Sequence, residues 1–159
     1  MLAWAMLTFG LAAPSLASGT VVKVSLWDKG PNSMDMLGKA MWGMGMKHED
    51  ASMATMGIDA NPKEVKAGEI TFEVTNDSSD VVHEMIVAPV KSTEKPLPYD
   101  KTTEKVKEDA AGHLGEVSEL DAKKTGSLKL TLKPGKYILY CNIPGHYVLG
   151  MWTLFTVTP

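Results

Sequence analysis

An all-β sandwich is the fold that the sequence predicts, and three features point to it. Apolar residues alternate with polar ones along several short segments, as they do in strands that are buried on one face. Clusters of Gly, Pro, Asn and Ser separate these segments. Most of the segments follow one another with no helical pattern between them. Six or more such strands favour an antiparallel sandwich.

The predicted strands are of two kinds. In the first kind, apolar residues alternate with Lys, Thr, Glu or Ser, which indicates half-buried strands. These apolar residues are Val22, Val24 and Leu26; Ile70, Phe72 and Val74; and Leu128, Leu130 and Leu132. The second kind, at 81–87, 136–141 and 152–157, has less polar alternation, which is typical of strands covered on both faces.

The segment 91–112 interrupts the strand pattern. It contains Pro96 and Pro98 and is then polar from Asp100, a candidate N-cap, to Gly112, a candidate helix end. We therefore expect a surface excursion that contains a short helix.

Composition limits the function classes. The 159 residues suit one domain. All 16 basic residues are Lys, against 19 acidic ones, so the net charge is −3 and the chain has no guanidinium group to grip phosphate. Nucleic acid is therefore not an expected partner. The single cysteine, Cys141, excludes an intramolecular disulfide and a zinc site with several thiolates.

The N-terminus has the features of a secretory signal. Residues 2–13 are apolar and uncharged, and 15–17 (Ser-Leu-Ala) provide small residues at a signal-peptidase spacing. We predict a signal peptide at 1–17, a mature domain at 18–159, and a periplasmic or otherwise exported protein. No Lys or Arg precedes the apolar run, so a start further upstream or a retained membrane anchor stays open. The run is shorter than the ~20 residues of a spanning helix.

The segment 140–152 carries the most chemical information. Cys141, His146 and Met151 follow one another at intervals of five residues, on a Gly- and Pro-containing loop between two predicted strands. A thiolate, an imidazole and a thioether are ligands that suit a copper ion cycling between Cu(I) and Cu(II), with a weak axial sulfur to tune the potential. The loop therefore predicts a copper site.

A second imidazole should come from another strand, because one flexible loop alone could not fix the geometry. His83 is the remaining histidine within a strongly apolar strand pattern, whereas His48 and His113 are poorly placed. A lone buried cysteine or histidine is more often an ordinary core residue. The combined spacing favours ligands over that interpretation.

These residues resemble those of the cupredoxins, or blue copper proteins. The Cys-x4-His-x4-Met spacing is similar to that of rusticyanin-, auracyanin- and sulfocyanin-like members, and less similar to plastocyanin, whose cysteine-to-histidine interval is shorter. The resemblance covers roughly residues 57–159, through the Thr-Asn-Asp-Ser turn, the His-Glu-Met strand, the Lys-Pro-Gly turn and the ligand loop.

The resemblance implies a Greek-key β-sandwich that holds one type 1 copper. By the match, His83, Cys141 and His146 are the equatorial ligands and Met151 is the axial one. It also implies an electron carrier with redox proteins as partners, such as cytochromes or a terminal oxidase, and we expect a monomer. Four protein ligands leave no open coordination position for a substrate, so we do not expect an enzyme.

Two further expectations concern the surroundings of the copper. Asn142 and Glu84 are the nearest candidates for hydrogen bonds around the Cys141 sulfur. An exposed apolar patch around His146 would suit a transient redox partner. Its residues would be Ile143, Pro144, Tyr147, Val148 and Leu149. The alternative is that Val148 and Leu149 only cap the core.

A Met-rich insert at 29–56 suggests a second function. Seven of the 11 methionines lie between Met34 and Met56. Thioether sulfur suits Cu(I), so Met44, Met46 and His48 could form a second Cu(I) site, and the protein could capture, buffer or deliver periplasmic copper. The alternative is that methionine, an adaptable filler, packs this segment over the end of the sandwich.

Overall fold

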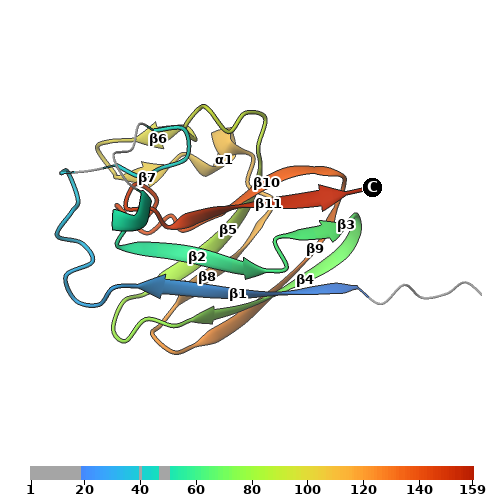
Figure 1. Cartoon of the computed structure of the whole chain (residues 1–159), viewed down its shortest axis with the longest axis horizontal. Helices are drawn as coiled ribbons and strands as arrows, with labels where there is room; N and C mark the ends of the chain where they lie inside the picture. Colours follow the sequence, from blue (N-terminus) through green and yellow to red (C-terminus); the bar gives the residue numbers. More distant parts are fainter. Residues whose placement is uncertain (1–18, 40, 47–50) are drawn as a thin grey trace, which may run out of the picture.

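The computed structural model describes residues 19–39, 41–46 and 51–159, and two β-sheets packed face to face dominate it (Figure 1). The predicted signal peptide and His48 lie outside the described residues. In one sheet the strand order is β2 (Met56–Asn61), β1 (Thr20–Asp28), β4 (Gly68–Asn76), β9 (Thr125–Leu132). In the other it is β3 (Glu64–Lys66), β11 (Trp152–Thr158), β10 (Gly135–Tyr140), β5 (His83–Pro89), β8 (Gly115–Leu120).

The predicted sandwich is confirmed, but its strand pairing is not antiparallel throughout. β1 pairs with β4 in parallel, and β11 pairs with β3 in parallel. Parallel neighbours need a crossover connection. The chain provides it here, because after β2 it passes through β3 in the opposite sheet before it returns as β4 beside β1.

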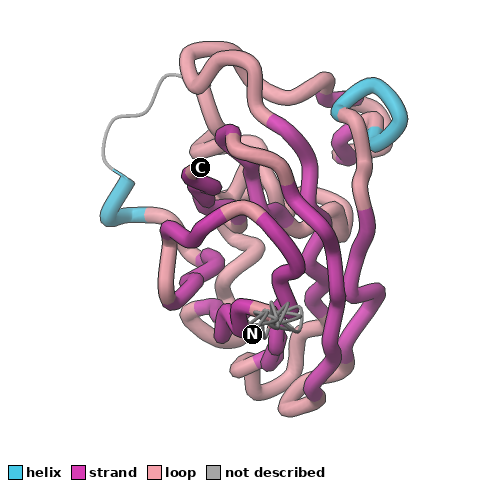
Figure 2. The backbone as a smooth tube through the Cα atoms, turned by 90° about the vertical axis from the view of Figure 1, so that its right-hand side faces the viewer, coloured by secondary structure: helices cyan, strands magenta, loops and turns pink. Residues whose placement is uncertain are grey.

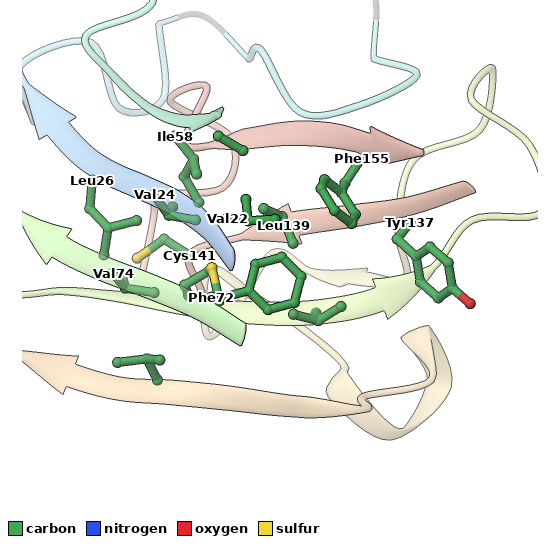
Figure 3. Packing of buried hydrophobic residues seen from close by; sticks show 14 of the residues in the cluster. Val22, Val24, Leu26, Ile58, Phe72, Val74, Tyr137, Leu139, Cys141 and Phe155 are labelled. Atoms are coloured by element: carbon green, nitrogen blue, oxygen red, sulfur yellow. The ribbon is translucent and has the colours of Figure 1, made fainter. Parts of the chain in front are cut away.

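The core lies between the two sheets (Figure 3). The alternating residues predicted from the sequence point inward from β1 and β4, where Val22, Leu26 and Phe72 have no exposed surface. Phe72 packs edge-to-face on Phe155 of β11, with 5.3 Å between ring centroids. Cys141, which directly follows β10, belongs to the same cluster.

The excursion at 91–112 contains a short hairpin as well as the expected helix. The hairpin is formed by β6 (Tyr99–Asp100) and β7 (Lys105–Val106), and the helix is α1 (Glu108–Ala111). Gly112 ends the helix in the left-handed conformation, as predicted. The prediction of Asp100 as N-cap is wrong, because its carboxylate accepts the backbone N–H of Thr102 and closes a turn, whereas the N-cap position is occupied by Lys107.

Both helical segments, α1 and the 3₁₀ turn η1 (Ala51–Met53), lie outside the layers of strands (Figure 2). Within the described residues, no helix is long and apolar enough to cross a membrane. The segment after β1, η1 and the loop between β10 and β11 gather at one end of the sandwich (Figure 1). This end holds the candidate site.

Candidate metal centre

Neighbouring strands bring three of the four predicted ligands together. His83 is the first residue of β5, Cys141 follows the last residue of β10, and His146 lies on the loop that leads to β11. β5 and β10 are antiparallel neighbours, with Ile86 opposite Tyr140, so the start of one strand lies beside the end of the other. The strand pairing itself therefore places His83 near the loop.

The ligand atoms of these residues face one another. The Nδ1 atoms of His83 and His146 are 3.2 Å apart, and the Cys141 Sγ is 3.4 Å from the His146 Nδ1. One ligand atom from each of the three residues lies within 4.8 Å of the others. All three side chains are buried, with at most 2% exposure. Two imidazole nitrogens and a thiol sulfur thus converge in the buried interior at this end of the sandwich.

Met151, the fourth predicted ligand, lies at the end of the same loop. It is completely buried, its N–H donates to the His146 carbonyl, and its carbonyl accepts the N–H of Cys141. Backbone hydrogen bonds thus hold it against two of the converging residues. The donor set fits copper better than zinc, because one thiolate, two imidazoles and a thioether combine soft and borderline ligands. The assignment of the four ligands stays a prediction.

Tight turns give the loop its shape. The N–H of His146 donates to the Ile143 carbonyl, and the N–H of Leu149 donates to the Gly145 carbonyl. Gly145 and Gly150 have φ of 82° and 99°, a conformation that residues with a Cβ adopt only at a cost. These glycines let the chain reverse twice between Cys141 and Met151.

Two neighbouring segments hold the loop in place. The Asn142 side chain accepts the N–H of Val106 at 2.6 Å and donates to the Val106 carbonyl and to the Glu108 carboxylate. The Tyr147 hydroxyl accepts the N–H of Leu97 and donates to the Met44 carbonyl. The polar excursion and the Met-rich insert therefore both fix the ligand loop.

The predicted hydrogen bond to the Cys141 sulfur is present for Glu84 but not for Asn142, whose N–H and side chain bond to other groups; the second backbone N–H that acts on the thiol is that of Ile143. The backbone N–H of Glu84 points at the Cys141 sulfur at 3.5 Å, and the Glu84 carboxylate accepts the N–H of Asn142 at 3.0 Å. Burial raises the pKa of Glu84. Glu84 thus ties β5 to the residue that follows Cys141, which keeps the distance between the two strands fixed at the site.

Burial shifts the titration of the converging groups towards their neutral forms. It raises the pKa of the Cys141 thiol to about 12, although the backbone N–H groups of Glu84 and Ile143 act in the opposite direction. Burial and then the neighbouring His83 lower the pKa of His146 to about 3. Burial also lowers the pKa of His83. A metal ion that is bound by the Cys141 thiolate and the two neutral imidazoles must therefore displace the proton of the thiol.

Asp28, the last residue of β1, is a member of the site that the sequence analysis missed. Its Oδ2 lies 2.9 Å from the His83 Nε2, and its side chain is 1% exposed. Burial alone would raise the pKa of Asp28, but hydrogen bonds from Ser78, His83 and the Gly30 N–H outweigh it and lower the pKa. The only sequence signal was an acidic residue at the end of a strong strand pattern, which also suits an ordinary turn.

The exposed apolar patch expected around His146 is not formed. Tyr147, Val148 and Leu149 are buried, with exposures of 0%, 3% and 0%, so the alternative that Val148 and Leu149 cap the core is correct. Pro144 is exposed, and Ile143 is half-buried. The physical reason is the insert, which lies against the loop, since Met34 and Leu37 would contact any side chain added at Gly145.

The two described residues of the second predicted site, Met44 and Met46, pack against the hydrophobic core. Met44 is buried and, with the partly buried Met46, packs in the cluster around Tyr147. This agrees with the packing alternative, while the Cu(I) site itself stays a prediction because His48 lies outside the described residues. His113 lies on the surface between the carboxylates of Glu108 and Glu116, away from the predicted ligands.

Comparison with solved structures identifies the fold. A reduced auracyanin from Roseiflexus castenholzii matches with a TM-score of 0.51 and 19% identity, over 90% of this chain and 99% of that one. Auracyanin A from Chloroflexus aurantiacus matches with a TM-score of 0.51 and 19% identity, over 89% and 100%. Rusticyanin from Thiobacillus ferrooxidans matches with a TM-score of 0.52 and 16% identity, over 89% and 79%. No family model and no curated protein matches the sequence. The chain therefore has the cupredoxin fold.

Proposed function

We propose that this protein holds one type 1 copper ion and carries single electrons between redox proteins. The observation that carries the proposal is the convergence of the His83 Nδ1, the His146 Nδ1 and the Cys141 sulfur in the buried interior, with the backbone of Met151 hydrogen-bonded to two of these residues. One of the structures with the same fold, auracyanin A, is described as a "blue" copper protein. The fold and the donor set thus support the same centre.

The rigidity of the site favours electron transfer. When bound there, copper supplies a one-electron couple, and the protein must hold similar ligand positions in both oxidation states. The chain can do so because His83 lies on a strand, the Cys141 sulfur faces the Glu84 N–H, and Asn142 fixes the loop to a neighbouring segment. Burial also excludes water, which would otherwise reorganise around the changing charge.

A redox partner would approach the centre over the insert. Met34 and Leu37 lie against the ligand loop at Gly145, and His146 is 2% exposed, so a partner docking at this end meets the insert before the histidine. We propose partners such as a cytochrome or a terminal oxidase, and an exported or periplasmic location that follows from the predicted signal segment.

Adding Cu(II) to the purified protein tests the proposal. We expect an intense blue or green colour from charge transfer between the Cys141 thiolate and copper, with one equivalent bound. Cys141→Ser should lose the colour while the sandwich still folds. The control His113→Gln changes an exposed histidine outside the centre and should keep it. A spectrum without an intense visible band, or one that survives in Cys141→Ser, would contradict the assignment.

The alternative, copper capture or delivery, differs in stoichiometry. It requires a second, exchangeable Cu(I) equivalent bound by Met44, Met46 and His48. The burial of Met44 against Tyr147 favours the electron carrier instead, because this sulfur already serves as packing. Titration of the reduced protein against a Cu(I) chelator separates the two: one equivalent supports the carrier, and two equivalents, falling to one when all three residues are replaced, support copper handling.

A further inference from the structure

Asp28 occupies a position that its sequence context does not explain. It ends β1, opposite Met56 of β2, in the sheet that contains none of the four predicted ligands. Its carboxylate is nevertheless buried and lies 2.9 Å from the His83 Nε2. A buried carboxylate without a role would be costly, since desolvation disfavours the charge.

The carboxylate is held in a fixed orientation. Its Oδ1 accepts the N–H of Gly30 at 2.7 Å, and the Ser78 hydroxyl also donates a hydrogen bond to the side chain. The Ser78 hydroxyl itself accepts the N–H of Val81, two residues before His83. The turn after β1 and the turn before β5 therefore both position Asp28 against His83.

This contact determines which nitrogen of His83 carries a hydrogen. A carboxylate can only accept, so the His83 Nε2 must donate, and the neutral ring then has its free lone pair on Nδ1. The Nδ1 is the atom that faces His146 at 3.2 Å, where the predicted ligands converge. Asp28 thus selects the tautomer that a metal ion needs.

We propose that Asp28 is a positioning residue that orients His83, fixes its tautomer and lowers the reduction potential of the centre through its negative charge. The proposal rests on the proposed copper site for the potential, whereas the tautomer is a property of the metal-free chain. A carboxylate behind a ligating imidazole makes the ring a stronger donor, and the added negative charge stabilises Cu(II) more than Cu(I). Loss of such a partner typically lowers metal affinity 10- to 100-fold.

Two variants and a matched control test the proposal. Asp28→Asn keeps the size and an acceptor oxygen but removes the charge, and Asp28→Ala removes both. Asp59→Asn removes a charge from an exposed position on the neighbouring strand β2 and serves as the control. If the variants lose Cu(II) affinity tenfold with Cu(I) affinity unchanged, the potential rises by about 59 mV for this one-electron couple. We expect voltammetry to show a rise for both Asp28 variants and none for Asp59→Asn.

The metal-free protein gives an independent measurement. Long-range ¹H–¹⁵N NMR of the imidazole nitrogens should show His83 as the Nε2–H tautomer in the wild type and as a mixture in Asp28→Ala. A single unchanged tautomer in Asp28→Ala, or equal potentials in Asp28→Asn and Asp59→Asn, would overturn the proposal. If the wild type gives no coloured Cu(II) complex, the proposed function fails, but the NMR result still decides whether Asp28 orients His83.

Discussion

The metal-free protein should lose stability as the pH falls from 7 towards 4, and His146 should account for much of the loss. Burial and the neighbouring His83 lower the pKa of His146 to about 3, whereas an unfolded imidazole titrates near 6.5. Between these values the unfolded chain binds a proton that the folded chain does not. The free energy of unfolding therefore rises with pH in this interval, and it falls as the pH is lowered.

The magnitude follows from the same shift. Each pH unit inside the interval contributes about 1.4 kcal/mol for one imidazole, so His146 should destabilise the fold by roughly 3 kcal/mol between pH 6.5 and pH 4. This is a large part of the ~5–15 kcal/mol that stabilises a typical domain. The lowered pKa of His83 adds to the loss, whereas the raised pKa of Glu84 acts against it as the pH approaches 4.5. A variant is needed to isolate His146.

The assay is urea unfolding of the metal-free wild type and of His146→Leu at pH 7, 6, 5 and 4. Leucine is apolar and cannot take up a proton, so the variant should lack the contribution of His146. The free energy of unfolding of the wild type minus that of the variant should fall by roughly 3 kcal/mol as the pH is lowered from 7 to 4. Two parallel curves would refute the reasoning, because they would mean that the buried imidazole is protonated as readily as an unfolded one.

The remaining predictions concern the ligand loop. Met151→Leu should keep copper bound and raise the reduction potential, and Met151→Gln should lower it, because the axial donor favours Cu(II); voltammetry with no shift in either variant would remove Met151 from the axial position. Gly145→Ala should lower the free energy of unfolding by at least ~1 kcal/mol, since φ is 82° and a Cβ there would lie 2.9 Å from the Leu37 side chain. Gly135→Ala, where a Cβ meets nothing closer than 3.7 Å, should change it less, and equal urea midpoints for the two would contradict this.

Local patterns predicted the parts of the fold that are buried on one face. The alternation at Val22, Val24 and Leu26 became β1, because every second residue of a strand points into the core. Alternation did not predict β8 (Gly115–Leu120), because Val117 is the only buried residue of that strand. It also missed β2, whose first residue, Met56, was assigned to the Met-rich insert.

In the candidate site too, some residues could be predicted from local sequence and one could not. The residues of the loop could be found because Cys141, His146 and Met151 are close in sequence and chemically distinctive. His83 could be found because it is a polar residue in an apolar strand. Asp28 could not, since its contact with His83 joins positions 55 residues apart in different sheets and depends on how the sandwich closes. The hydrogen-bond partner of a predicted ligand depends on tertiary packing, which leaves no recognisable pattern in the nearby sequence.

The insert shows how such packing sets the surroundings of a predicted ligand without changing the ligand itself. Its Met34 and Leu37 lie against the loop at Gly145, and the Met44 carbonyl accepts a hydrogen bond from the buried Tyr147 hydroxyl. Burial keeps His146 neutral, since an imidazolium there would lose its hydration and be repelled by His83, and the attraction of the Asp28 carboxylate does not outweigh these effects. If the protein carries electrons as proposed, a covered histidine also places extra protein between the centre and a redox partner. In the proposed electron carrier, the residues that cover the neutral His146 would therefore also set the distance over which an electron travels.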